Sequence, residues 1–315
     1  MLNRNAEALF WVGRYMERAE NHARLINVHY HIQHELDFDN AEFKWARLID
    51  ALGARAEYEA QFECFTQKDV LSFITLDRGY PNSLFSCVSQ ARTNLRTLRE
   101  KLPSELWESL NAFYLWLGEK QVDDILTESP NLFYKQIKER TAMFNGIQQS
   151  VMLRESEWHF MESGKYLERS ENTVRILQSV MNAIDEDQAT PYPYLVAVLK
   201  SVSSYQAFRK YYADGVSVEH IFEFLIGNSL FPRSIHYSFT HLARHLEEID
   251  SASPPSRKEK VCRQAGKIKA ELACLERDDM SIPQVSTLLE GLLSDCGKLG
   301  RTMAANFFQL EGATA

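Results

Sequence analysis

The chain has 315 residues, of which 45% are apolar and 25% charged, and its formal net charge is −8. This acidic balance excludes the overall positive charge that binds nucleic acid or an anionic membrane surface. No apolar run approaches the roughly 18 residues of a transmembrane helix, and the charged N-terminal stretch lacks the apolar centre of a signal peptide.

The five cysteines are scattered and contain no CxxC pair, so the sequence indicates neither a zinc site nor a disulfide framework. We expect reduced, buried thiols in a cytoplasmic protein. We expect no metal and no cofactor, and neither a membrane nor a nucleic acid as a partner.

Apolar residues recur at three- and four-residue intervals along nearly the whole chain, as in amphipathic α-helices. In chain order the predicted helices are 6–35, 41–65, 67–77, 83–101, 104–116, 130–150, 155–184, 191–212, 218–225, 232–249, 257–277 and 281–308. Asn82-Ser83 and Asn228-Ser229 stand where helix N-caps belong. Because the strict alternation of strands is absent, we predict an all-α fold.

A repeated segment sets the organisation of the chain. GRYMERAENHARLI at 13–26 returns as GKYLERSENTVRIL at 164–177, with seven of fourteen positions identical. Self-similarity of this kind indicates an internal duplication. We predict two halves, 1–150 and 151–315, forming a helical bundle that is related by a pseudo-twofold axis and shares one core. Further pairs are expected between Leu48, Leu52, Tyr58 and Leu195, Leu199, Tyr205, and between 82–85 and 228–231.

The repeated helix separates polar from apolar residues when its positions are placed at 100° intervals. The polar arcs are the candidate ligand-binding residues: Arg14, Glu17, Arg18, Glu20, Asn21 and Arg24, with Lys165, Glu168, Arg169, Glu171, Asn172 and Arg175. Three interpretations are open. The arcs form an exposed face, a buried network that pairs Glu17 with Arg169 and Glu168 with Arg18, or a ligand-binding face.

Many of the polar residues are the same in both copies of the motif, and this argues against the exposed face. Exposed ion pairs contribute only about 0.3–0.5 kcal/mol and constrain sequence weakly, and Asn is a mediocre mid-helix residue that nevertheless stays at both Asn21 and Asn172. If the face binds a ligand, arginine forks beside carboxylates and an amide suit an amino acid or a peptide terminus. A nucleotide is less suited, because no Gly-rich phosphate loop is present.

Further candidates are weaker. Tyr15 and Tyr166 belong to the repeated motif, Asn82 and Ser83 to the expected cap, and Arg92 and Arg96 to a basic stripe that is either solvated or faces the same cavity. His241 and His245 have the i,i+4 spacing of a helical metal pair, but no Glu stands between them, so we interpret them as surface histidines.

The opening NRNAEALFWVGRYMERAENHAR, the second copy from 160 to 175 and the segment 82–111 resemble the Alpha-E family, a bacterial helical domain with a Glu-Arg motif. Two departures are Lys165, where the family usually has Arg, and Glu162-Ser163, where an apolar residue is common. The resemblance implies a partnership with a circularly permuted ATP-grasp protein, near transglutaminase-like proteases, in peptide synthesis or modification.

Three functional hypotheses follow. The first is an accessory subunit of such a system, which binds a carboxylate- or amine-bearing peptide, an amino acid or the ATP-grasp partner through the Glu-Arg-x-Glu-Asn face. The second is an enzyme, a transferase or hydrolase with Glu17 or Glu168 as general base, although adjacent arginines lower the pKa that a base needs. The third is a structural scaffold.

Overall fold

The computed structural model describes residues 3–35, 41–187, 192–249, 255–276 and 280–308, and every element within them is helical. The all-α prediction is confirmed. The first half contains α1 (Asn3–Glu35), α2 (Ala41–Ala51), α3 (Arg55–Glu59), α4 (Gln67–Leu76), α5 (Leu84–Arg96), α6 (Ser104–Gly118), α7 (Val122–Glu128) and α8 (Pro130–Val151). The second half contains α9 (Ser156–Asp187), α10 (Tyr192–Ser201), α11 (Tyr205–Tyr211), α12 (Val218–Phe222), α13 (Ile235–Glu248), α14 (Pro255–Ala273) and α15 (Ile282–Met303), with π-helical turns η1 (Glu223–Gly227) and η3 (Ala304–Phe308).

Two predicted helices are broken in the structure. The helix expected over 41–65 ends at a left-handed turn at Gly53, with φ +64°, and the helix expected over 191–212 breaks at Ser203, with φ 55°. A left-handed residue ends the hydrogen-bond ladder of a right-handed helix. Helix α7 was missed, although Gln121 and Asp124 form a capping box at its start. Residues 191 and 277, at the ends of two predicted helices, lie outside the described residues.

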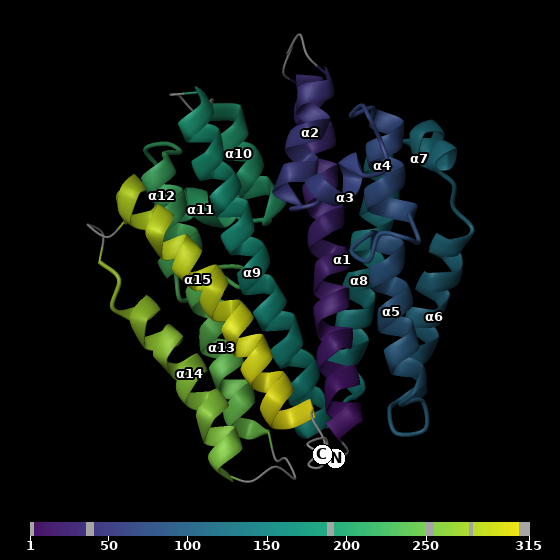
Figure 1. Cartoon of the computed structure of the whole chain (residues 1–315), viewed down its shortest axis with the longest axis vertical. Coiled ribbons are helices and arrows are strands. Elements are labelled where there is room, and N and C mark those ends of the chain that lie inside the picture. Colours follow the sequence, from purple (N-terminus) through teal and green to yellow (C-terminus); the bar gives the residue numbers. More distant parts are fainter. Residues whose placement is uncertain (1–2, 36–40, 188–191, 250–254, 277–279, 309–315) are drawn as a thin grey trace.

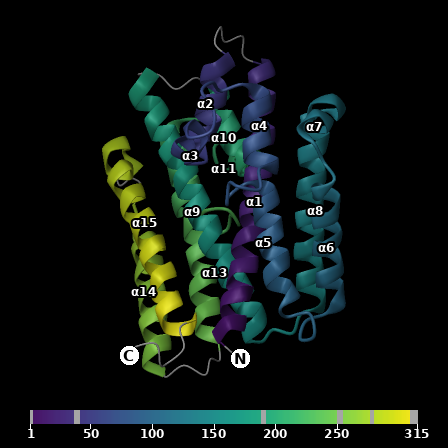
Figure 2. The same ribbon diagram turned by 45° about the vertical axis from the view of Figure 1, so that its right-hand side comes forward.

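The long helices α1 and α9 run side by side through the middle of the molecule (Figure 1). On one side α1 packs against α5 and α8, and α6 packs on both of these. On the other side α9 packs against α13 and α15, and α14 packs on both of these. Figure 2 shows from a second direction that α14 and α15 lie on one side of the central pair and α5, α6 and α8 on the other. The two sides therefore cover the central pair with matching sets of helices.

Close contact between α1 and α9 depends on two glycines of the repeated motif. A Cβ on Gly13 would stand 2.0 Å from the carbonyl oxygen of Met161, and a Cβ on Gly164 would stand 2.0 Å from that of Phe10. No residue with a side chain fits at either position without moving the backbone. The crossing brings the polar arcs on the following turns within hydrogen-bonding distance of the opposite helix.

Local hydrogen bonds repeat between the halves at an offset of 151. Ser83 Oγ donates to the carbonyl of Asp77 and accepts from the third residue of α5, and Ser234 Oγ does the same with Asn228 and α13. Ser83 is therefore the N-cap that the sequence predicted. Ser229 is not a cap, and the expected pairing of 82–85 with 228–231 is wrong by five residues.

A similar correction applies to the expected pairing of Tyr58 with Tyr205. The Tyr58 N–H bonds to the carbonyl of Ala54, and the Phe208 N–H bonds to that of Ser204, so Tyr58 corresponds to Phe208 at an offset of 150. The pairs expected for Leu48 and Leu52 are displaced by the same three residues. The duplication, with halves 1–150 and 151–315, stays an inference, and the nearly constant offset supports it.

Candidate functional site

Buried ion pairs join α1 to α9. Glu168 accepts hydrogen bonds from Arg18 at 2.7 and 2.9 Å and from Nε of Arg14 at 2.7 Å. Arg14 also donates to Glu171 at 2.5 Å, and Arg18 donates to Oδ1 of Asn82 at 2.6 Å. Both carboxylate oxygens of Glu168 are therefore bonded to guanidinium groups.

The reciprocal pair has the same form. Glu17 accepts from Arg169 at 2.8 and 2.7 Å and from Arg233 at 3.2 Å. Asn21 donates to Glu17 at 3.3 Å and accepts from Arg233 at 2.8 Å. The side chain of Glu17 is 0% exposed and that of Glu168 is 3% exposed. Of the three interpretations of the polar arcs, the structure excludes the exposed face and shows the buried network at these positions.

The network lowers the pKa of its two central carboxyl groups. Burial alone would raise the pKa of Glu17, but the charges of Arg169 and Arg233 outweigh burial and lower it to about 2. Burial opposes ionisation of Glu168 as well, yet Arg18 and Arg14 hold its pKa well below the usual range. A general base works best with a pKa near the operating pH. Neither carboxylate suits that role.

Arg233 is a network residue that the sequence analysis missed. It precedes the N-cap of α13 and donates to Glu17 and Asn21, and to Glu20 at 2.6 Å. Asn82 occupies the equivalent place before α5. The signal was available, because YPNS at 80–83 and FPRS at 231–234 are separated by 151 residues, the offset of the repeated helices.

The second copy differs from the first at Lys165. Arg14 crosses to α9, whereas Lys165 donates to Glu162 on its own helix at 2.9 Å. Glu162 is buried and also accepts from Gln148 at 3.0 Å. The two departures from the family pattern, Lys165 and Glu162, therefore neutralise each other.

The last arginines of the two motifs have different surroundings. Arg24 donates to Glu20 at 3.0 and 2.6 Å and to the hydroxyl of Ser203 at 2.5 Å. Arg175 instead faces Gly53, which stands in the first half where the second has Ser203, and a Cβ added to Gly53 would be 3.6 Å from Nη1 of Arg175. Among the described residues no carboxylate lies within ion-pair distance of Arg175, and its helical neighbour Glu171 pairs with Arg14.

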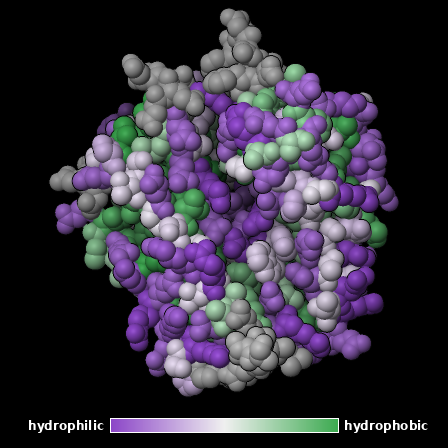
Figure 3. Space-filling view, viewed as in Figure 1, coloured by the Kyte–Doolittle hydropathy of each residue, from purple (hydrophilic) through white to green (hydrophobic). Residues whose placement is uncertain are grey.

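A pocket of about 470 Å³ lies beside Arg175, between the halves. Figure 3 shows hydrophilic residues around a hollow between the two sides of the molecule. The lining residues are His29, Arg47, Asp50, Ala51, Gly53, Arg55, Arg175, Gln178, Ser179, Asn182 and Tyr194. The described part of the lining therefore contains three arginines and one carboxylate.

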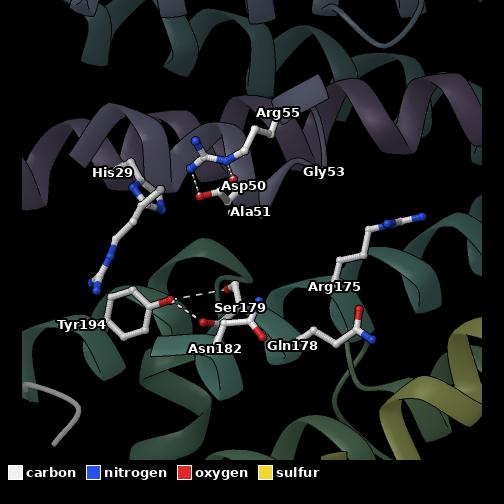
Figure 4. A pocket seen from close by; sticks show the side chains of 11 residues that line it. His29, Asp50, Ala51, Gly53, Arg55, Arg175, Gln178, Ser179, Asn182 and Tyr194 are labelled. Atoms are coloured by element: carbon white, nitrogen blue, oxygen red, sulfur yellow. Dashed lines mark hydrogen bonds and ion pairs between the residues drawn. The ribbon is translucent and has the colours of Figure 1, made fainter. Parts of the chain in front are cut away.

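The walls of the pocket carry different chemistry. On the wall formed by α2 and α3, Arg55 is paired with Asp50 at 2.5 Å (Figure 4). On the opposite wall the hydroxyl of Tyr194 donates to the carbonyl of Ser179 at 3.2 Å (Figure 4). Arg175 shares one face of α9 with Gln178 and Asn182, at i+3 and i+7. A guanidinium followed by amides suits a carboxylate attached to a peptide group.

The secondary candidates separate into two groups. Tyr15 and Tyr166 lie against the network, with their rings 5.8 and 5.4 Å from the guanidinium carbons of Arg18 and Arg169. Asn82 joins the network and Ser83 caps α5, as described above. Arg92 instead donates to Asn111 of α6 and packs over aromatic rings there, and Arg96 is exposed. Neither lines the pocket.

The interpretation of His241 and His245 as surface histidines is wrong for His245, which is buried. Its Nδ1 lies 3.0 Å from Nδ1 of His159, and both His241 and His245 stack on Tyr166, with centroids 5.2 and 5.6 Å away. The sequence missed this cluster because His159 comes from a different helix. In the part of the chain that the structure describes, no helix is both long and apolar enough to cross a membrane.

Comparison with known proteins identifies a family and several relatives. A family model described as a predicted alpha-helical domain with a conserved ER motif matches residues 1–308. Uncharacterized proteins of Mycobacterium bovis and Mycobacterium tuberculosis are 26% identical over 270 residues, which is 80% of this chain and 30% of each relative. The chain thus spans less than a third of the length of these relatives. No solved structure matches it significantly.

Proposed function

Since the chain belongs to the Alpha-E family, we propose that it is an accessory binding domain that takes a carboxylate-bearing peptide or amino acid in the pocket beside Arg175. The ion network has a different role in this proposal. It fixes α1 against α9, the helix that carries Arg175.

One observation carries the proposal: the pocket contains an arginine that has no carboxylate partner among the described residues, followed by two amides on one helical face. A guanidinium with an open site binds a carboxylate through paired hydrogen bonds. The equivalent arginine of the other half, Arg24, is already bonded to Glu20 and Ser203. This difference favours the pocket over the network as the binding site.

The partner is also part of the proposal. We propose that the domain works beside a circularly permuted ATP-grasp protein, which would attach or modify the bound peptide. The identity of this partner comes from the family resemblance, and the relatives add only that the matched region is 30% of a larger chain. The enzyme hypothesis is less favoured, because Glu17 and Glu168 are ionised and fully bonded. Involvement of a transglutaminase-like protease remains an expectation from the family resemblance.

Calorimetry with the purified chain tests the binding proposal. Trialanine with a free C-terminus should bind, and trialanine amide should bind at least about tenfold more weakly, because it lacks the charge that pairs with arginine. Arg175→Gln should abolish the difference. Arg244→Gln, on an exposed residue of α13, is the matched control. Equal binding of the two peptides, or of neither, would refute the proposal.

Co-expression tests the partner. The chain and the ATP-grasp protein of the same organism should elute as one complex in size-exclusion chromatography. Separate elution at micromolar concentrations would refute the proposed partner, whereas the proposed binding of a peptide in the pocket does not depend on this result.

A further inference from the structure

A small chamber lies beside the pocket, between α1, α2 and α9. Its volume is about 20 Å³, enough for one water-sized group. Ala51 and Arg175 line both the chamber and the pocket. The chamber therefore adjoins the pocket.

Two polar atoms on the chamber residues have no partner in the described protein. They are Nδ1 of His22 and Nδ2 of Asn172, and both atoms are buried. His22 as a whole is 7% exposed. Leaving such atoms unbonded costs free energy, so a buried polar atom of this kind calls for a guest that bonds to it.

The matching positions in the other half are bonded. Asn21, equivalent to Asn172, donates to Glu17 and accepts from Arg233. Thr173, equivalent to His22, donates to the backbone carbonyls of Arg169 and Arg233. The unbonded pair thus occurs on the side where Arg175 lines an open pocket.

The chamber atoms have opposite hydrogen-bonding roles. Burial and the nearby Arg18 lower the pKa of His22 to about 4, so its ring is neutral at pH 7. An interaction with the backbone of Asn82 favours the charged form of the ring and raises its pKa, against burial. Because Nδ1 has no partner and the ring interacts with the backbone of Asn82, we assign the ring proton to Nε2, and on this assignment Nδ1 accepts. Nδ2 of Asn172 donates.

One atom that both donates and accepts has the two roles that these groups require, and a hydroxyl oxygen is such an atom. A carboxylate is unsuitable because it brings no donor to Nδ1, and an ammonium brings no acceptor to Nδ2. A cation would also stand close to Arg175. We infer that the chamber receives the hydroxyl group of a ligand whose carboxylate lies in the pocket against Arg175, so that the ligand is a hydroxyl-bearing carboxylate. This inference rests on the proposed function and narrows its ligand class.

Matched ligands test the inference by calorimetry on the full chain. The probes are the ω-hydroxy acids from glycolate to 6-hydroxyhexanoate, each compared with the acid that has a methyl group in place of the hydroxyl. At one chain length the hydroxy acid should bind about tenfold more tightly, the effect of two added hydrogen bonds. Asn172→Leu should remove this preference and retain binding of the methyl compound. Asn145→Leu, on α8, is the control.

Nitrogen NMR of labelled histidine gives a second readout without a substitution. The preferred hydroxy acid should shift the Nδ1 resonance of His22, and the methyl compound should leave it in place. If every pair binds equally and binding depends on Arg175, the chamber holds only water and the inference is overturned, while the pocket proposal stands. If no carboxylate binds at any length, the proposed function fails as well.

Discussion

Arg169 of α9 and Glu17 of α1 share two hydrogen bonds, of 2.8 and 2.7 Å, across the crossing of the two longest helices. The carboxylate is fully buried, and its equivalent Glu168 is held in the same way by Arg18. Pairs of this kind are costly to break singly, because the remaining charge stays buried without compensation. Their first consequence is for stability.

Glu168→Gln should destabilise the fold by about 3–5 kcal/mol, because Arg14 and Arg18 lose their shared counter-charge. Urea unfolding at pH 7 measures the change. Glu59→Gln, which breaks an exposed pair with Arg55, is the control and should cost no more than about 1 kcal/mol. Similar losses for the two variants would show that the buried network contributes little.

Gly13→Ala and Gly164→Ala should each cost about 1–3 kcal/mol or more, because the new Cβ would meet a backbone carbonyl of the other helix. Gly146→Ala is the matched control. It lies in α8 with open space around it, and alanine there should stabilise by up to about 1 kcal/mol. Thermal unfolding of the three variants decides the matter. A crossing that tolerates either alanine would contradict the close approach.

Arg233→Asn should cost about 1.5–3 kcal/mol, because Glu17 and Glu20 lose charged hydrogen bonds and Asn21 loses its donor. The substitution places in the second half the residue that stands at Asn82 in the first. Arg244→Asn, on the exposed side of α13, should change the free energy of unfolding by less than about 0.5 kcal/mol. Equal effects at 233 and 244 would exclude a structural role for Arg233.

Stability should fall when the pH is lowered from 6.5 to 4. Burial lowers the pKa of His22 to about 4, and burial with the nearby His159 and His241 lowers that of His245 to about 3, whereas an unfolded histidine titrates near 6.5. Within this window the unfolded chain binds protons that the folded chain does not. The stabilising contribution is therefore complete above pH 6.5 and is lost as the pH falls.

Each of these histidines should add about 1.4 kcal/mol per pH unit to the slope of the free energy of unfolding against pH. Urea unfolding between pH 7.5 and 4.5 measures this slope, and His245→Gln should reduce it by the contribution of one histidine. A free energy of unfolding that is independent of pH in this range would contradict the burial of these rings. Below pH 4.5 the lowered pKa of Glu17 adds a loss of the same sign, which continues to about pH 2.

The all-α fold followed from hydrophobic periodicity, because long amphipathic helices carry a strong local signal. The breaks at Gly53 and Ser203 did not, since a single left-handed residue leaves the apolar pattern on each side intact. The correct equivalence of the later segments was also missed. Short runs such as NSLF match by coincidence at an offset of 146 residues, whereas the hydrogen bonds of Ser83 and Ser234 repeat at an offset of 151 residues.

Much of the network was predictable, and the pocket was not. The pairing of Glu17 with Arg169 follows from two copies of one helix placed face to face. The pocket depends on what is missing around Arg175, where Gly53 and Ala51 bring no side chain that could fill the space. The tertiary packing decides which helices face Arg175, and the local sequence around Arg175 does not predict it.

The glycine crossing also limits how the molecule can move. Backbone carbonyl groups pack against Gly13 and Gly164, and one turn further along Arg18 and Arg169 bond to the opposite helix. These contacts fix α1 and α9 in one register, because sliding of either helix would break all of them together. The pocket can therefore change its width only if α2 or α10 moves relative to the fixed pair of α1 and α9.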